Sequence, residues 1–349
     1  MDYVNLGKTG VKVSRICLGC MSYGVPPSGP LRPGSNAWSL NEEQSQPFFR
    51  QALDAGINFF DTANVYSTGD SERVLGRFLK ANAKREDTVI ATKLNGVMRD
   101  GPNGGGLSRK EIFFEIDESL RRLGTDYVDV YHIHETDSLT PVEETLATLD
   151  KFVREGKVRY IACSNFSGWR LMKSLSVSER HGWSRYIGHQ VYYSLLNREY
   201  EWELMPLALD QGIGALIWSP LGWGRLTGKI RRSSPIPEDS RLNSKLVRDI
   251  GPQVPEEHLY KVVAAIDEIA GETGKTVPQI ALNWLLRRPT VSTLIIGARN
   301  AWQLKQNLGA VGWSLTPQQI ARLDAASQVS LIYPYWHQRQ FEERNPSPV

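Results

Sequence analysis

Three short apolar runs in this sequence each end in a polar residue that can take part in acid–base chemistry, and these end residues are Asp61, Lys93 and His134. A tyrosine, Tyr66, follows the first of them by five residues, across a turn. If the three runs are neighbouring parallel strands, their carboxyl ends meet at one rim and the four side chains gather there. The pattern therefore predicts an acid–base site at the strand ends and favours architectures that contain a parallel sheet.

Helix-like and strand-like segments alternate along the chain about eight times. The strand-like runs, such as Gly214–Trp218 and Thr293–Ile296, are almost entirely apolar, which is typical of parallel strands buried between layers of helices. Eight such units close into a barrel that carries its functional residues at the carboxyl ends of the strands. The sequence therefore predicts an α/β fold, a (β/α)8 TIM barrel, with an N-terminal β-hairpin over residues 3–13 and extra C-terminal helices.

The competing architecture is a doubly wound dinucleotide-binding fold, which carries the pattern G-x-G-x-x-G after its first strand. The corresponding stretch here, Gly19–Gly24, lacks the middle glycine. A chain of 349 residues would hold two domains of average size, but no shift in composition marks a boundary. We expect one domain over residues 1–349, with a C-terminal tail over residues 330–349.

Several helices are expected to begin at local capping patterns. Asn41–Gln44 and Ser108–Glu111 match the capping box, in which the first and fourth residues each satisfy the other's backbone amide. Thr140–Glu143 offers an N-cap threonine, then a proline at the first helical position and a glutamate at the third. Thr316–Gln319 opens one more helix. The paired arginines 121–122 are expected on solvated helix surface.

The net charge of +3 is too small to indicate a nucleic-acid or membrane partner. The first residues, Met1–Asn5, lack the basic head and apolar core of a signal peptide. No apolar run is long enough to span a bilayer. Without an export signal, three cysteines favour a reducing compartment, so we expect a cytoplasmic protein.

The four polar residues suit the reduction of a carbonyl group. A tyrosine can protonate a developing alkoxide if a neighbouring cation stabilises its phenolate and lowers its pKa below the usual value near 10. Lys93 would supply that charge, and Asp61 would hold Lys93 in place and keep it protonated. His134 would donate a hydrogen bond to the carbonyl or relay a proton. Because no side chain carries a hydride, the reaction also requires a bound nicotinamide.

From Leu6 to about Leu323 the chain resembles the NADPH-dependent aldo-keto reductases, including the bacterial members with long loops. The motifs that carry the resemblance are Gly56–Ala63 with Tyr66, then Ala91–Lys93, then His132–His134. The resemblance implies a catalytic tetrad of Asp61, Tyr66, Lys93 and His134. Some relatives serve as channel subunits and have lost the histidine, which this chain keeps. The implied reaction is the reduction of aldehydes and ketones to alcohols.

The resemblance also implies a set of NADPH-binding residues. Around the nicotinamide these are Ser164, Asn165, Gln190 and Trp218, the last of which would stack on the ring. Along the loop over the pyrophosphate they are Ser219, Pro220, Leu221, Gly222, Gly224, Arg225 and Lys229, joined by Arg241. On the adenosine side they are Gly297, Arg299, Gln303 and Asn307. Gly297 and Ala298 stand where many relatives have a lysine, so the 2′-phosphate would rest mainly on Arg299, which favours NADPH over NADH.

The substrate is expected to be a small carbonyl compound in a mainly apolar pocket. Candidate lining residues are Met21, Trp38 and Trp223. After His134 the chain has Glu135–Thr136 in place of the more usual aromatic or basic residue, so the substrate preference of relatives does not carry over. The sequence leaves open whether the protein is a monomer or a homo-oligomer.

Two other functions remain open at this stage. One is a nucleotide-sensing subunit that binds NADPH without turnover, against which the intact tetrad argues. The other is a metal-dependent barrel hydrolase with His132, His134 and His189 as ligands, which would need further ligands at other strand ends. A third signal, Cys17–Cys20, has the spacing of a zinc or redox pair, but no second pair completes a zinc site. We therefore expect no metal.

Overall fold

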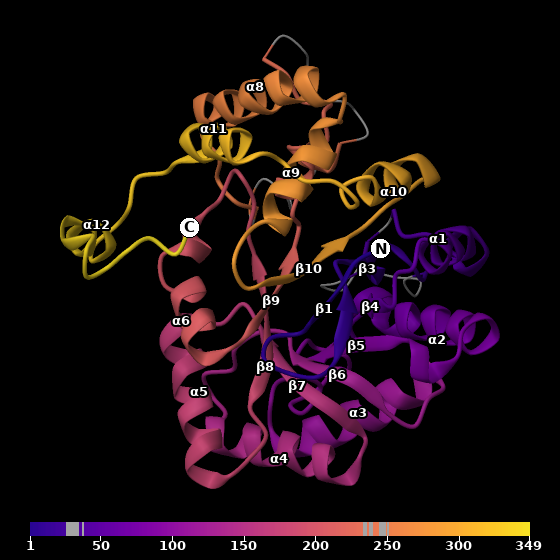
Figure 1. Ribbon diagram of the computed structural model, residues 1–349. Helices are drawn as coiled ribbons and strands as arrows, with labels where there is room; N and C mark the ends of the chain where they lie inside the picture. The colour runs from indigo at the N-terminus through magenta and orange to yellow at the C-terminus, as the bar shows by residue number, and fades with distance from the viewer. Residues whose placement is uncertain (26–34, 37, 233–235, 237–239, 244–248, 250) are drawn as a thin grey trace.

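Eight parallel strands close into a barrel in the computed structural model, which describes residues 1–25, 35–36, 38–232, 236, 240–243, 249 and 251–349. Around the barrel the strands follow the order β10, β3, β4, β5, β6, β7, β8, β9. Their bounds are β3 Ile16–Gly19, β4 Phe59–Asp61, β5 Val89–Leu94, β6 Val128–Ile133, β7 Val158–Ser164, β8 Tyr186–Tyr192, β9 Gly214–Trp218 and β10 Val291–Ile296. The predicted (β/α)8 barrel is thereby confirmed (Figure 1).

Helices follow the barrel strands in turn and cover the outside of the barrel (Figure 1). They are α1 Glu42–Asp54, α2 Asp70–Asn82, α3 Arg109–Leu123, α4 Val142–Glu155, α5 Gly168–His181, α6 Leu204–Gln211, α8 Glu256–Thr273, α9 Val277–Leu286, α10 Ala301–Leu308, α11 Pro317–Ser327 and α12 Tyr335–Gln338. Between β9 and β10 lie two of them, α8 and α9, and α11 packs against α8. The predicted extra helices near the C-terminus are therefore present.

Alternation along the strands separates two apolar layers. Phe59, Ala91 and Val130 belong to a small cluster inside the barrel, whereas their neighbours Phe60 and Ile90 belong to the large layer beneath the helices. Side chains of a strand point alternately to its two faces, so a residue two positions after an inward residue also points inward. This rule decides which polar residues reach the site described below.

The predicted N-terminal hairpin is confirmed, and it contributes to the inner layer. Its strands β1, Tyr3–Asn5, and β2, Lys12–Ser14, pair antiparallel. Leu6 and Val13 from this hairpin are fully buried in the inner cluster of the barrel. We infer that the hairpin completes the packing of the barrel interior.

The helix starts show where local patterns hold and where tertiary contacts override them. The capping boxes of Asn41 and Thr316 are both present. Ser108 caps α3 through its side chain, but Glu111 binds Arg99. The prediction for Thr140 was wrong: Pro141 is the N-cap of α4, and the Thr140 hydroxyl donates to Asp137 at 2.7 Å. Asp137 also accepts from the backbone amides of Leu139, in its own loop, and of Leu107, in the loop before α3, so the Thr140 hydroxyl stabilises the loop rather than the helix start.

The tail over residues 330–349 carries the short helix α12 and projects from the side of the barrel (Figure 1). Its contact with the rest of the chain includes Tyr335, whose ring lies 5.8 Å from that of Trp202. Among the described residues, no helix combines the length and the apolar character required to cross a bilayer.

Candidate active site

Strand register gathers the polar residues of β4, β5 and β6 at one rim of the barrel. Asp61 pairs with Ala91, and Lys93 pairs with His132. Asp61 and Lys93 each lie two positions after an inner-layer residue, so both point inward. By the same alternation His134, two positions after His132, faces the barrel mouth. The strand register therefore brings Asp61, Lys93 and His134 together at one rim, as the sequence predicts.

Lys93 lies at the centre of the group and is fully buried. Its Nζ donates to Asp61 Oδ2 at 2.5 Å, to the Thr62 carbonyl at 2.8 Å and to the Tyr66 hydroxyl at 3.4 Å. Burial acts to lower the pKa of Lys93, but the Asp61 carboxylate and the Tyr66 oxygen outweigh it, so the pKa is raised. Lys93 therefore carries a fixed positive charge against the phenol.

Tyr66 is placed by a tight turn after β4. Ser67 and Thr68 both have left-handed backbone angles, with φ of 50° and 52°, a conformation uncommon outside glycine. The Ser67 hydroxyl donates to the Gly24 carbonyl at 2.8 Å and holds the turn. The Tyr66 hydroxyl is thus aimed at Lys93 by the backbone as well as by its own hydrogen bond.

The expectation of a lowered Tyr66 pKa is not met. Burial raises the pKa of Tyr66, and the Lys93 ammonium lowers it by less, so the net direction is upward. The phenol therefore stays protonated at neutral pH. A protonated phenol beside a fixed cation is a proton donor whose phenolate is stabilised once the proton has left.

His134 stands on the other side of Tyr66, with the two rings edge to face and their centroids 5.8 Å apart. Burial, and then the Lys93 ammonium, lower the pKa of His134 to about 3. The imidazole is neutral at physiological pH, and its remaining N–H can donate a hydrogen bond. Of the two roles considered for His134, this favours donation of a hydrogen bond to the carbonyl over relay of a proton.

A buried ion-pair network behind the rim corrects the expectation for the two arginines. Arg121 is on the surface, but Arg122 is buried, and its Nε donates to Glu72 Oε2 at 2.5 Å. Glu72 also accepts from Thr92, the neighbour of Lys93, at 2.6 Å. The network therefore contacts β5 at Thr92, the residue next to Lys93, and stabilises the position of this strand. Arg122 also donates to a second carboxylate, that of Glu115 on α3. Glu115 in turn accepts from Asn64, so the network extends to the turn that carries Tyr66.

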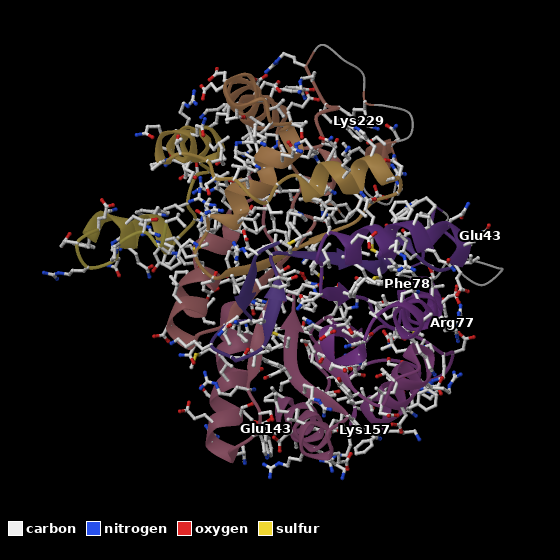
Figure 2. All side chains as sticks on the ribbon, turned by 45° about the vertical axis from the view of Figure 1, so that its right-hand side comes forward. Glu43, Arg77, Phe78, Glu143, Lys157 and Lys229 are labelled. Carbon is white, nitrogen blue, oxygen red and sulfur yellow. The ribbon has the colours of Figure 1, made fainter. Side chains whose placement is uncertain are left out.

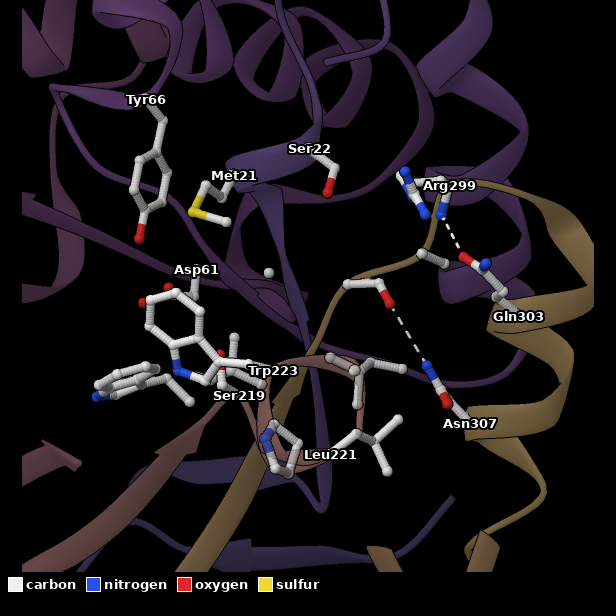
Figure 3. Close-up of a pocket in the computed structure, with 18 of the residues that line it drawn as sticks. Met21, Ser22, Asp61, Tyr66, Ser219, Leu221, Trp223, Arg299, Gln303 and Asn307 are labelled. Carbon is white, nitrogen blue, oxygen red and sulfur yellow. Dashed lines mark hydrogen bonds between the residues drawn. The ribbon is translucent and has the colours of Figure 1, made fainter. Parts of the chain in front are cut away.

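A pocket of about 620 Å³ opens over the rim. Figure 3 shows Tyr66, Met21 and Trp223 at one end and Arg299, Gln303 and Asn307 at the other. Its volume is typical of a site for a cofactor or a drug-sized ligand. The pocket therefore joins the acid–base group to a second region that carries cationic side chains.

The residues expected around a nicotinamide all line this pocket. Ser164 is buried, and its hydroxyl has no hydrogen-bond partner among the described residues. Gln190 donates to Asp61 Oδ1 at 2.9 Å, and Trp218 donates to Asn165 Oδ1 at 3.0 Å. An unpartnered hydroxyl beside two amide side chains fits a ligand that carries an amide, because buried polar groups are normally satisfied.

At the far end, the residues expected on the adenosine side also line the pocket. The Arg299 amide donates to Gln303 Oε1 at 2.9 Å, and Asn307 donates to the Gly297 carbonyl at 3.4 Å (Figure 3). These contacts fix both ends of α10 against the segment that follows β10. The site thus presents a helix N-terminus next to Arg299, an arrangement that suits an anion.

The loop after β9 fits the expectation only in part. Ser219, Pro220, Leu221, Gly224 and Lys229 line the pocket. Gly222 and Arg225 do not: the Arg225 guanidinium donates to the carbonyls of Gly222 and Pro252, both at 3.3 Å. Arg225 therefore stabilises the loop and gives no support to the expected phosphate contact. The side chain of Arg241 lies outside the described part of the chain.

Two of the three expected substrate residues, Met21 and Trp223, line the pocket near Tyr66. Trp38 is not among the lining residues; its ring faces the Arg299 guanidinium, with 6.0 Å between that group and the ring centroid. Trp38 thus lies beside the cationic end of the pocket rather than beside the tetrad. Sequence position alone does not separate these two ends.

The metal alternative finds no ligand set in the described ranges, where no group of three or more His, Cys, Asp or Glu side chains is arranged to hold a metal ion. His189 instead accepts a hydrogen bond from the Phe166 amide at 3.1 Å. Cys17 and Cys20 are buried free thiols, and burial raises the pKa of each. Neither signal gains support from the structure.

We expect His189 to make the fold sensitive to acid. It is buried, and burial lowers its pKa to about 3, whereas the unfolded chain takes up this proton near pH 6.5. The unfolded state therefore binds more protons between these values, and the stability falls by about 1.4 kcal/mol per pH unit as pH drops through this window. Urea unfolding between pH 7 and pH 5 should show a shallower decline for His189→Gln. Equal slopes would contradict this contribution.

Comparisons with known proteins cover nearly the whole chain. The model of the Aldo/keto reductase family matches residues 15–328. Versiconal hemiacetal acetate reductase of Aspergillus parasiticus is 34% identical over 96% of this chain and 99% of its own length. L-glyceraldehyde 3-phosphate reductase of Escherichia coli O157:H7 is 33% identical over 93% and 92%. A putative voltage-gated potassium channel subunit beta of Schizosaccharomyces pombe is 36% identical over 91% of each chain.

Proposed function

This chain belongs to the aldo/keto reductase family, and from that premise we propose that it reduces aldehydes or ketones to alcohols with NADPH. The observation that carries the proposal is the contact of the Lys93 ammonium with both the Asp61 carboxylate and the Tyr66 hydroxyl at the base of the pocket. Such a group can deliver a proton to an oxygen atom that gains negative charge.

Each member of the proposed tetrad has a distinct role. Tyr66 donates its proton to the carbonyl oxygen, and Lys93 stabilises the phenolate that remains. Asp61 keeps Lys93 charged and in place. His134 donates a hydrogen bond from its neutral ring to the same oxygen. When bound, a nicotinamide nucleotide would supply the hydride to the carbonyl carbon. The carbonyl oxygen takes the Tyr66 proton, which completes the alcohol, and solvent restores the proton to Tyr66.

The cofactor would lie along the pocket from the tetrad to α10. Ser164 and Gln190 are proposed to hold the carboxamide, Trp218 to cover the ring, and Lys229 and Arg299 to neutralise phosphate charge.

Because the three cysteines of the chain are buried free thiols, we also propose a reducing, cytoplasmic location.

Arg299 is proposed to distinguish NADPH from NADH. Arg299→Ala should raise the KM for NADPH by about 10- to 100-fold, since a hydrogen bond to a charged group contributes about 1.5–3 kcal/mol, and should change the KM for NADH by much less. Steady-state kinetics with both cofactors measures this, and Lys305→Ala, on the exposed face of the adjacent helix α10, is the charge-matched control. Equal increases for the two cofactors would refute the role.

The proposed reaction is tested by incubating the protein with NADPH and an aromatic aldehyde. We expect loss of the nicotinamide absorbance and formation of one equivalent of alcohol per NADPH consumed.

A second candidate function is favoured by the similarity to a potassium channel subunit beta, and in that case the protein would bind NADPH with negligible turnover. Tight NADPH binding without alcohol formation from any of a panel of aldehydes and ketones would favour this second function.

A further inference from the structure

Glu135 directly follows His134 and lines the same pocket. Its backbone carbonyl accepts from Asn95 Nδ2 at 2.9 Å, which ties the loop after β6 to the loop after β5. Its Oε1 accepts from Asn165 Nδ2 at 3.0 Å, at the end of β7. The backbone of Glu135 is therefore held by the loop after β5 and its carboxylate by Asn165, and the side chain remains exposed at the mouth of the pocket.

The charges along the pocket are unevenly distributed. The cationic side chains Lys229 and Arg299 line the far end, and Asp61 is neutralised by Lys93. Within the described residues, no lysine or arginine lies within ion-pair distance of the Glu135 carboxylate, whose partner is the neutral amide of Asn165. The end next to His134 therefore carries one negative charge that the described side chains do not compensate.

The surroundings of Glu135 strengthen the effect of this charge. Partial burial raises the pKa of Glu135, while the hydrogen bond from Asn165 lowers it by less. A partly desolvated carboxylate interacts with a nearby charge more strongly than one in bulk water. Its position beside His134, at the rim where the carbonyl would lie, places a substrate substituent within reach of it.

We propose that Glu135 is a specificity-determining residue that favours carbonyl substrates carrying a positively charged group and disfavours anionic ones. This inference rests on the proposed function, because it assigns the substrate class of the same site. Exposure to solvent weakens the interaction through screening. We therefore expect a preference of about tenfold or more for a cation over an anion, which corresponds to about 1.4 kcal/mol.

The test uses three benzaldehydes that differ in charge, and each kcat/KM is divided by the rate constant for reduction of the same aldehyde by borohydride, which corrects for the effect of the substituent on carbonyl reactivity. Their para substituents are trimethylammoniomethyl, hydroxymethyl and carboxymethyl groups, each separated from the ring by one methylene. The ratio of kcat/KM for the cation to that for the anion should be about ten or more in the wild-type protein. It should fall towards one in Glu135→Gln, which keeps the size and the acceptor for Asn165, and should reverse in Glu135→Lys.

Glu143→Gln is the matched control. It removes the same charge from the exposed first turn of α4, and Glu143 is not among the residues that line the pocket. Figure 2 shows Glu143 at the opposite end of the molecule from the pocket residue Lys229. This variant should keep the wild-type ratio. A ratio near one in the wild-type protein, or an equal fall in Glu143→Gln and Glu135→Gln, would overturn the inference.

Binding of the three corresponding benzyl alcohols, measured by calorimetry, separates this inference from the proposed function. If the protein reduces none of the aldehydes, the proposed reaction fails, and the alcohols still report on Glu135. A cationic alcohol that binds about tenfold more tightly than the anionic one in the wild-type protein, but not in Glu135→Gln, supports the inference. Equal affinities in both proteins overturn it, whether or not turnover is seen.

Discussion

Tyr66→Phe is expected to lower kcat by about 10²- to 10⁴-fold, the usual contribution of a positioned general acid, while the affinity for NADPH stays nearly unchanged. The substitution removes only the hydroxyl that contacts Lys93. The ring remains, so its edge-to-face packing with His134 is retained. Single-turnover kinetics with NADPH and an aldehyde, together with a fluorescence titration of NADPH, would measure the two quantities separately.

A matched control separates the lost proton from a general effect of removing a hydroxyl. Tyr200 is a buried tyrosine whose hydroxyl bonds to Thr290 at 2.7 Å, and it does not line the pocket. Tyr200→Phe should therefore leave kcat within about twofold while costing about 1 kcal/mol of stability. Near wild-type turnover by Tyr66→Phe would show that another group supplies the proton.

Lys93→Met is expected to destabilise the fold by about 3–5 kcal/mol and to abolish turnover. Removal of one partner of a buried ion pair leaves an uncompensated charge, and here Asp61 and Lys93 are both buried. Asp61→Asn should be destabilising for the same reason, because it leaves the ammonium without its counter-ion. Urea unfolding at pH 7 would measure both changes in the free energy of unfolding.

The double variant Asp61→Asn/Lys93→Met provides the decisive comparison. With neither charge present, its loss of stability should be smaller than the sum of the two single losses by at least about 2 kcal/mol. It should also be inactive, because the phenolate of Tyr66 would lack its cation. Additive losses would show that the two charges do not stabilise each other in the folded protein.

The raised pKa of Tyr66 changes the account of how the phenol works. The sequence suggested a phenol made acidic in advance by Lys93. In the structure burial outweighs that effect, so the proton is retained until an oxygen atom beside the hydroxyl gains negative charge. Lys93 then acts on the phenolate as it forms, which is the point at which stabilisation increases the rate.

The rim of the barrel could be predicted from the sequence because each reactive residue ends an apolar run. Once Asp61 and Lys93 are assigned to parallel strands, alternation brings them together without knowledge of any loop. Ser164 and Gln190, which the family resemblance implied, also pair across β7 and β8. Residues set by strand register were therefore the most predictable part of the site.

Residues whose position depends on contacts between helices or loops were not predictable in this way. Arg122 was expected in solvent with Arg121, yet it lies buried against Glu72. The available signal was that Glu115 and Arg122 are seven residues apart and so share one face of α3. The close approach of α2 and α3, at which a Cβ on Gly76 would lie 2.1 Å from the Leu123 carbonyl oxygen, could not be read from either helix alone.

Loop residues were the least predictable. Arg225 was expected on the pyrophosphate because of its place in a glycine-rich segment, but it bonds to backbone carbonyls of its own loop and of Pro252. Trp38 was expected at the substrate end but faces Arg299. In both cases residue type indicated a plausible role, while the path of the loop determined the actual contact.

In the proposed reaction Tyr66 and its neighbours protonate a carbonyl while a bound nicotinamide reduces it. The most direct test is to supply NADPH deuterated at the transferable C4 position with an aromatic aldehyde and to analyse the alcohol by mass spectrometry. We expect one deuterium per alcohol, attached to the carbinol carbon, and no labelled alcohol from Tyr66→Phe on the same timescale. An alcohol without the label, or no alcohol at all from the wild-type protein, would contradict the proposed reaction.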